Sequence, residues 1–142
     1  MIHFFYEDIE QKVSEKHIPW LQKIIEIEGK KLGEINYIFC DDEYLLKINQ
    51  DFLKHDFYTD IITFDNVKGK TISGEIFVSL PRVFENASTL SKNVEEELKR
   101  VLAHGILHLC GYKDKTEAEE KEMRNKEDFY LEFPLSPEEE NN

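Results

Sequence analysis

Hydrophobic and polar positions follow two different periods along the chain, and these periods predict an order of strands and helices. Four segments show the aromatic and β-branched content, or the strict alternation, that is typical of strands: Ile2–Glu7, Ile35–Cys40, Ile61–Asp65 and Gly74–Leu80. A short polar loop, Asn66–Lys70, separates the last two and has the length of a hairpin connection. The pattern therefore predicts that these two strands are antiparallel neighbours.

Helical spacing of apolar residues appears between these strands. Ile18–Leu32 has this spacing, and Gly33 is expected to end the helix. Asp41–Phe52 opens with acidic residues, which the positive end of a helix dipole favours, and therefore predicts a second helix. Pro81 suits the first turn of a third.

Two further helices are each preceded by the spacing of a capping box, in which a polar cap residue is followed three positions later by glutamate. The two pairs are Asn93 with Glu96 and Thr116 with Glu119. We expect the first of these helices to run to about Leu109 and the second to about Leu131. Strands and helices thus share the chain without any repeat or linker, which favours one domain at 1–132 followed by an acidic tail at 133–142.

Composition and charge narrow the class of protein. The chain has 142 residues, of which 40% are hydrophobic and 34% charged, as in an ordinary globular domain. Its net charge of −12 argues against a general coat for nucleic acid, because such proteins neutralise phosphates with lysine and arginine. Half of the acidic excess lies after residue 114.

The chain also lacks the patterns of export and membrane insertion. It opens without the basic and then apolar regions of a signal peptide, and no apolar run approaches the roughly 20 residues of a membrane span. We therefore expect a cytoplasmic protein, with Cys40 and Cys110 as reduced thiols and no membrane partner.

The strongest chemical signal is the segment AHGILHLCGYKD, which places two histidines in an apolar stretch near the end of a predicted helix. His104 and His108 are four residues apart, so they project from one face and can bind one metal ion together. Gly111 then suits a helix end, and the chain can fold back to bring Asp114 towards the same point. A single histidine here would usually be a core residue, but this combination favours a metal site.

The spacing His-x₃-His-x₂-Gly-x₂-Asp matches that of metzincin zinc sites, which carry glutamate after the first histidine and a histidine at the last position. Three protein ligands leave a fourth position for water, as in catalytic zinc sites. The expected catalytic centre is therefore a metal-bound water held by His104, His108 and Asp114, with one Zn²⁺ per chain.

The residue after the first histidine separates two reaction classes. Gly105 stands where a zinc peptidase has its general base, and glycine cannot accept a proton, so peptide hydrolysis is disfavoured. Phosphodiester cleavage can instead rely on the metal, with either water or the RNA 2′-hydroxyl as the attacking group. Thr59 and Asp60 have two possible roles. They either orient the metal ligands or the bound water without binding the metal, or they form the turn before the next strand.

The segment HGILHLCGYKD, from His104 to Asp114, resembles the signature HGxLHLxGYDH of the YbeY endoribonucleases, also called rRNA maturation factors. INQDFLKHDFYTDIITF (Ile48–Phe64) is similar to the family's NxxYRxxDxPTDVLSF, and GEIFVS (Gly74–Ser79) is similar to its GDI-type strand. The likeness extends over roughly Cys40–Tyr130.

This resemblance implies an α+β fold, with a four-stranded mixed sheet packed with about five helices and a metal site at the end of a central helix. It implies a metal-dependent, single-strand-specific endoribonuclease that acts in 3′-end maturation of 16S rRNA, rRNA processing and ribosome quality control. The implied partners are single-stranded RNA, rRNA and the small ribosomal subunit, and not DNA. His104 and His108 would be the first two zinc ligands, and Asp114 falls at the family's third histidine.

The departures from the family pattern concern charge. Asp114 can bind zinc through a carboxylate oxygen but adds negative charge to the site. Leu53 stands at the position of the family arginine, which leaves Lys54, His55 and Lys113 as the expected RNA-contacting cations. Two alternatives follow: a ribosome-associated metal-binding factor with weak or no nuclease activity, and, with less support, a metalloprotease.

Overall fold

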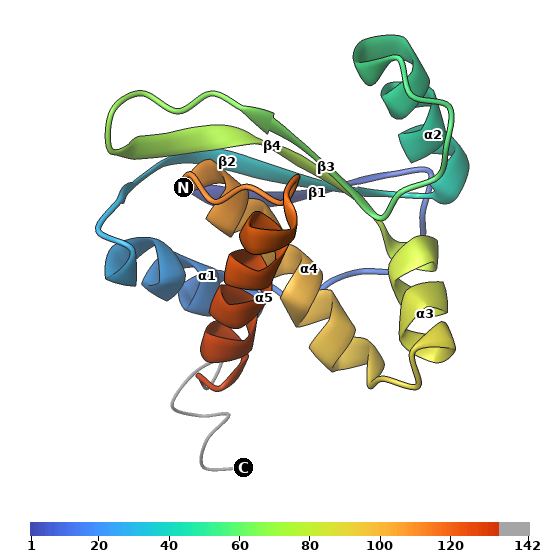
Figure 1. Cartoon of the computed structure of the whole chain (residues 1–142). Coiled ribbons are helices and arrows are strands. Elements are labelled where there is room, and N and C mark those ends of the chain that lie inside the picture. Colours follow the sequence, from blue (N-terminus) through green and yellow to red (C-terminus); the bar gives the residue numbers. More distant parts are fainter. Residues whose placement is uncertain (134–142) are drawn as a thin grey trace.

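A four-stranded mixed sheet forms the centre of the fold in the computed structural model, which describes residues 1–133 (Figure 1). The strands are β1 (Ile2–Glu7), β2 (Lys31–Cys40), β3 (Ile61–Asp65) and β4 (Thr71–Ser79). Their order is β1-β2-β4-β3, with β1, β2 and β4 parallel and the edge strand β3 antiparallel to β4. The expected mixed sheet and its hairpin are therefore confirmed.

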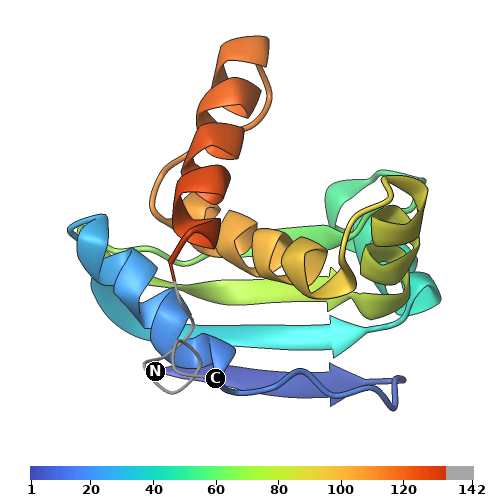
Figure 2. The same cartoon turned by 90° about the horizontal axis from the view of Figure 1, so that it is seen from below.

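Five helices accompany this sheet, as expected: four contact it directly, and α5 packs on α4. They are α1 (His17–Ile27), α2 (Asp42–Leu53), α3 (Leu80–Thr89), α4 (Val94–Leu109) and α5 (Glu117–Leu131). α2 lies on one side of the sheet and the other four lie on the opposite side (Figure 1). Seen from below, α1 and α4 cross the sheet, while α5 extends past its β3 edge (Figure 2).

The predicted helix caps form. The side chain of Asn93 accepts a hydrogen bond from the Glu96 backbone N–H at the start of α4. At the start of α5, Thr116 and Glu119 form both halves of the capping box. Both helices end where the sequence predicts, at Leu109 and Leu131.

The main core lies between the sheet and the helices α1 and α4. It contains the buried residues Trp20, Leu21, Ile24 and Ile25 from α1, Leu102 and Ile106 from α4, and Ile35, Tyr37, Phe39, Ile76 and Val78 from the sheet. A smaller cluster of Cys40, Leu45 and Ile62 lies beneath α2. Both cysteines are free, as expected.

The predicted helix over Ile18–Leu32 is wrong at its end. α1 stops at Ile27, and the chain reverses at Gly29, whose φ of +74° favours glycine. Leu32 lies in β2, where it pairs with Ile72 of β4, so Gly33 lies inside a strand and does not end a helix. Pairing with a strand far along the chain outweighs the helical spacing of Leu32. The same pairing starts β4 at Thr71, earlier than expected.

Two other expectations concern the ends of the chain and the membrane. The acidic tail expected at 133–142 lies, apart from Phe133, outside the described residues. Within residues 1–133, none of the helices combines the length and the apolar character that crossing a membrane requires.

Gly105 allows α4 to approach the sheet closely beside the two histidines. A Cβ atom at this position would lie 2.9 Å from Cγ2 of Ile76 on β4 and 3.3 Å from Cδ1 of Ile61 on β3. Any larger residue would therefore force the helix or the sheet to move. The absence of a side chain thus sets how near His104 lies to the edge strand.

We predict that Gly105→Ala destabilises the protein by about 1 kcal/mol, because an overpacking cost of about 1–3 kcal/mol exceeds the gain of about 1 kcal/mol in helix propensity. Urea unfolding followed by circular dichroism measures the change. Asn125→Ala, at an exposed position of α5, is the control and should be neutral or slightly stabilising. A Gly105→Ala protein as stable as the control would contradict the close packing described here.

Candidate metal centre

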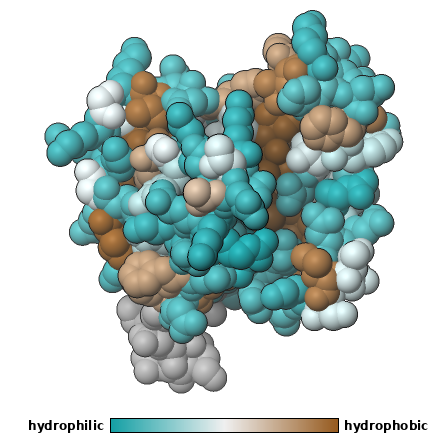
Figure 3. Space-filling view, in the orientation of Figure 1, coloured by the Kyte–Doolittle hydropathy of each residue, from teal (hydrophilic) through white to brown (hydrophobic). Residues whose placement is uncertain are grey.

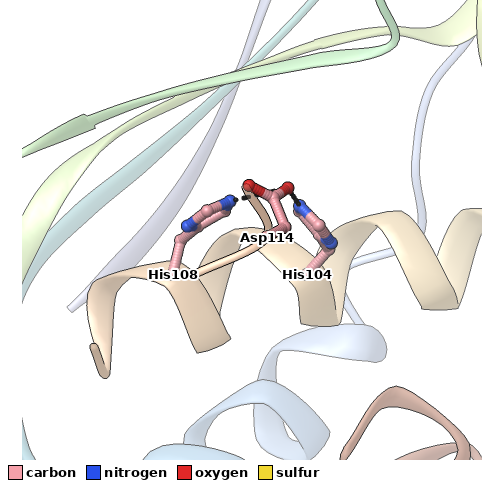
Figure 4. Close-up of side chains that lie close together, drawn as sticks. All are labelled: His104, His108 and Asp114. Atoms are coloured by element: carbon pink, nitrogen blue, oxygen red, sulfur yellow. Dashed lines mark hydrogen bonds and ion pairs between the residues drawn. The ribbon is translucent and has the colours of Figure 1, made fainter. Parts of the chain in front are cut away.

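Three polar side chains converge beside the C-terminal half of α4 (Figure 4). His104 and His108 project from one face of the helix, and Asp114 reaches them from the loop that leads to α5. Nε2 of His104 lies 3.2 Å from Oδ2 of Asp114, and Nε2 of His108 lies 3.3 Å from the same oxygen. The structure therefore brings the three predicted ligands together.

The turn after α4 explains how Asp114 returns to the helix. Gly111 has a φ of +110°, which favours glycine, and its N–H bonds to the His108 carbonyl oxygen. The next residue, Tyr112, donates its hydroxyl to Glu28 at the end of α1, at 2.7 Å. Tyr130 of α5 also donates to Glu28. This shared carboxylate ties the Asp114 loop to α1 and α5.

The environment of Glu28 favours its charged form. Burial acts to raise the pKa of its carboxyl, but hydrogen bonds from Tyr130 and Tyr112 and the nearby Lys126 ammonium outweigh burial and hold the pKa below its ordinary value. The loop that carries Asp114 is therefore held by a hydrogen bond from Tyr112 to a Glu28 carboxylate that is ionised at neutral pH.

The three side chains fit a tetrahedral metal ion. With metal–ligand bonds of 2.0–2.1 Å, two adjacent ligand atoms of a tetrahedron lie about 3.3 Å apart. The two distances between histidine nitrogen and aspartate oxygen, 3.2 and 3.3 Å, match this edge length. Ligand atoms of all three residues lie within 4.8 Å of one another. Two imidazoles and one carboxylate also leave room for a further ligand, as catalytic zinc sites require.

A buried carboxylate contacts His104 at Nδ1, the ring nitrogen that is not next to Asp114. Oε2 of Glu127, on α5, lies 2.7 Å from Nδ1 of His104, and Oε1 of Glu127 accepts a hydrogen bond from Arg100 of α4 at 2.9 Å. The sequence offers one signal for this residue. Glu127 falls in the helical series of Met123 and Tyr130, both buried, and so occupies the inward face of α5.

Carboxylates dominate the electrostatics around His104. Burial acts to lower the pKa of this imidazole, but the hydrogen bond with Glu127 and the charges of Asp114 and Asp60 raise it above the ordinary value. Asp60 is itself largely buried, and burial raises the pKa of its carboxyl although His104 counteracts the shift. The site thus concentrates negative charge that a cation would neutralise.

Two adjoining hollows meet at this cluster, and Asp60, Ile61, His104 and Asp114 line both. The larger runs between α4 and α5, and the smaller follows β3 past His108 and includes Thr59. The space-filling view shows a recess with apolar surface between polar side chains on the face where α5 lies in front (Figure 3). Thr59 and Asp60 therefore lie beside the predicted ligands.

The three cations expected to contact RNA lie elsewhere, and none of them lines either hollow. Lys54 ends α2 and donates to the Asp51 carbonyl oxygen, and His55 stacks on Phe57. Lys113 is exposed, next to Asp114. The larger hollow is lined instead by three cations of α4 and α5, namely Arg100, Lys121 and Arg124.

Comparison with known proteins identifies the family. The family model described as Endoribonuclease YbeY matches residues 4–133. Endoribonuclease YbeY of Flavobacterium johnsoniae is 57% identical over 133 residues, which cover 90% of this chain and 93% of the relative. Endoribonuclease YbeY of Christiangramia forsetii is 54% identical over 128 residues, which cover 89% and 90%.

The fold agrees with these sequence relationships. A solution structure of a Thermotoga maritima protein superposes with a TM-score of 0.69 at 34% identity, covering 93% of this chain and 87% of that protein. The match of the family model includes every strand and helix described above except the first two residues of β1. The chain belongs to the YbeY endoribonuclease family.

Proposed function

We propose that this protein is a metal-dependent endoribonuclease that cleaves single-stranded RNA in the cytoplasm and acts in rRNA processing, including 3′-end maturation of 16S rRNA and ribosome quality control. One observation carries the proposal: two imidazoles and a carboxylate of a YbeY family chain meet at the edge length of a tetrahedral metal site. Its partners are single-stranded RNA and the small ribosomal subunit, and its cofactor is one zinc ion per chain.

The chemistry follows from what the hollow contains. A zinc ion held by His104, His108 and Asp114 would polarise a phosphoryl oxygen and lower the pKa of bound water towards about 7. Gly105 supplies no base, so our candidate for handling a proton is Asp60, which does not belong to the ligand set and lines both hollows with His104. Its raised pKa brings its carboxyl closer to the range in which side chains exchange protons at neutral pH.

RNA must also be held by cations, and the structure offers two sets. Lys121 and Arg124 are exposed on α5 and line the hollow that contains His104. Within residues 1–133 neither forms an ion pair, whereas Arg100 is engaged by Glu127 and Asp128. We propose that Lys121 and Arg124 contact phosphates next to the metal, and that Lys54, His55 and Lys113 contact RNA outside the two hollows.

A second candidate is a ribosome-associated metal-binding factor with weak nuclease activity. The observation that favours it is Leu53, an apolar residue at the family's arginine position. Acidic side chains in the hollow, Asp60, Glu97, Glu117 and Glu120 among them, also oppose phosphate binding. A metalloprotease has less support because glycine follows His104. Assays on unstructured RNA and on casein, each with His108→Ala as the control for contaminating enzymes, separate the three functions.

We predict that the purified protein carries about one zinc per chain and that His104→Ala or His108→Ala removes it, because each imidazole supplies one of three protein ligands. Elemental analysis after dialysis measures the zinc content. RNA cleavage should disappear together with the metal. Stoichiometric zinc in either variant would rule out this ligand set.

Asp114 distinguishes this chain from the family pattern, and two substitutions test it. Asp114→Ala should lower zinc affinity, whereas Asp114→His should keep a folded, metal-bound protein that favours zinc more strongly over manganese or magnesium, since imidazole is the softer ligand. Competition titrations with a chelator measure both affinities. An Asp114→Ala protein that binds zinc as tightly as the wild type would make Asp114 a surface turn residue.

The two sets of cations can be compared through the salt dependence of RNA binding. Each phosphate contact to a single strand contributes about 0.7 to the slope of log affinity against log salt. Lys121→Ala with Arg124→Ala should therefore reduce the slope by about 1.4. Lys54→Ala with Lys113→Ala is the matched control, because it changes the net charge equally. A larger effect in the control pair would place the main phosphate contacts at Lys54 and Lys113 instead.

A further inference from the structure

The two histidines of the cluster differ in the partner of Nδ1, the ring nitrogen that is not next to Asp114. Nδ1 of His104 lies 2.7 Å from Oε2 of Glu127, and among the described residues Nδ1 of His108 has no such partner. An imidazole that binds metal through Nε2 carries its hydrogen on Nδ1, and an acceptor there fixes both the tautomer and the ring plane. Glu127 supplies this acceptor to His104 alone.

Glu127 is itself held in place. Its side chain is 7% exposed, and its second oxygen accepts a hydrogen bond from Nη1 of Arg100 at 2.9 Å. A buried carboxylate is stable only when its oxygens are paired, so rotating Glu127 away from His104 would break two charged contacts at once. Arg100 is fixed in turn by Asp128, at 2.6 Å from its other terminal nitrogen.

The position of this contact links the metal site to the packing of α5. Arg100 and His104 are one helical turn apart on α4, and Glu127 lies opposite both of them on α5. Met123 and Tyr130 bury the same face of α5 on either side of Glu127. The loop that carries Asp114 leads into this helix. The packing of α5 on α4 therefore positions Asp114, one of the expected metal ligands, and also Glu127, which contacts a second expected ligand, His104.

We propose that Glu127 is a positioning residue, which fixes His104 for metal binding and is itself oriented by Arg100. The inference rests on the proposed metal site and adds a residue that does not touch the metal. Substitution of Glu127 should therefore weaken metal binding strongly, and should change the thermal stability of the metal-free protein less.

The test compares zinc affinity and zinc release in Glu127→Gln, Glu127→Leu and Asp128→Asn. Asp128→Asn is the matched control, because it also removes one negative charge and weakens one partner of Arg100 but leaves His104 untouched. Chelator competition gives the dissociation constant, stopped-flow transfer of zinc to the chelator gives the release rate, and thermal melting of the metal-free proteins reports on the fold.

We expect Glu127→Leu to weaken zinc binding by about 10–100-fold and to speed release, with Glu127→Gln between it and the wild type because an amide oxygen still accepts from Nδ1–H. Asp128→Asn should stay near the wild type. We also expect Glu127→Gln to melt near the wild type, so its affinity stays interpretable if the leucine variant fails to fold. Equal affinities of the wild type and Glu127→Gln, or equal losses in Glu127→Gln and Asp128→Asn, overturn the inference. A wild-type chain that binds no zinc overturns the proposed site itself.

Discussion

The packing of α4 between the sheet and α5 is the constraint on which the candidate site depends. On one side the helix lies so close to the sheet that a Cβ atom at position 105 would lie 2.9 Å from Cγ2 of Ile76. On another side Arg100 and His104 meet the buried carboxylate of Glu127. His104 and His108 line the hollows that lie beside these contacts, between α4, β3 and α5.

The same packing places charge where a cation is needed. Glu127, Asp114 and Asp60 surround His104, and together they raise its pKa above the ordinary value although burial opposes this. Clustered negative charge in a partly buried site is costly, so a bound metal ion would relieve repulsion as well as take up the ligands. In a protein with net charge −12, the proposed binding of RNA phosphates would depend on the metal and on the few cations nearby.

The sequence predicts those parts of the fold and site that depend on neighbours along the chain. The caps at Asn93 and Thr116 mark their helices because a cap bonds to residues three positions away. His104, His108 and Asp114 are identifiable because one helix and one turn bring them together. The sequence does not predict the end of α1, because Leu32 pairs with a residue of β4 that lies far along the chain. It also does not identify Glu127 as a partner of His104, because only the packing of α5 on α4 brings the two side chains together.

We have proposed that His104, His108 and Asp114 bind one metal ion. Crystals grown with zinc, measured on both sides of the zinc absorption edge, test it most directly, because anomalous scattering locates the ion without reference to activity. We expect one strong peak per chain at about 2.0–2.1 Å from Nε2 of both histidines and from one carboxylate oxygen of Asp114. No peak there, or a peak bound by other residues, would contradict it.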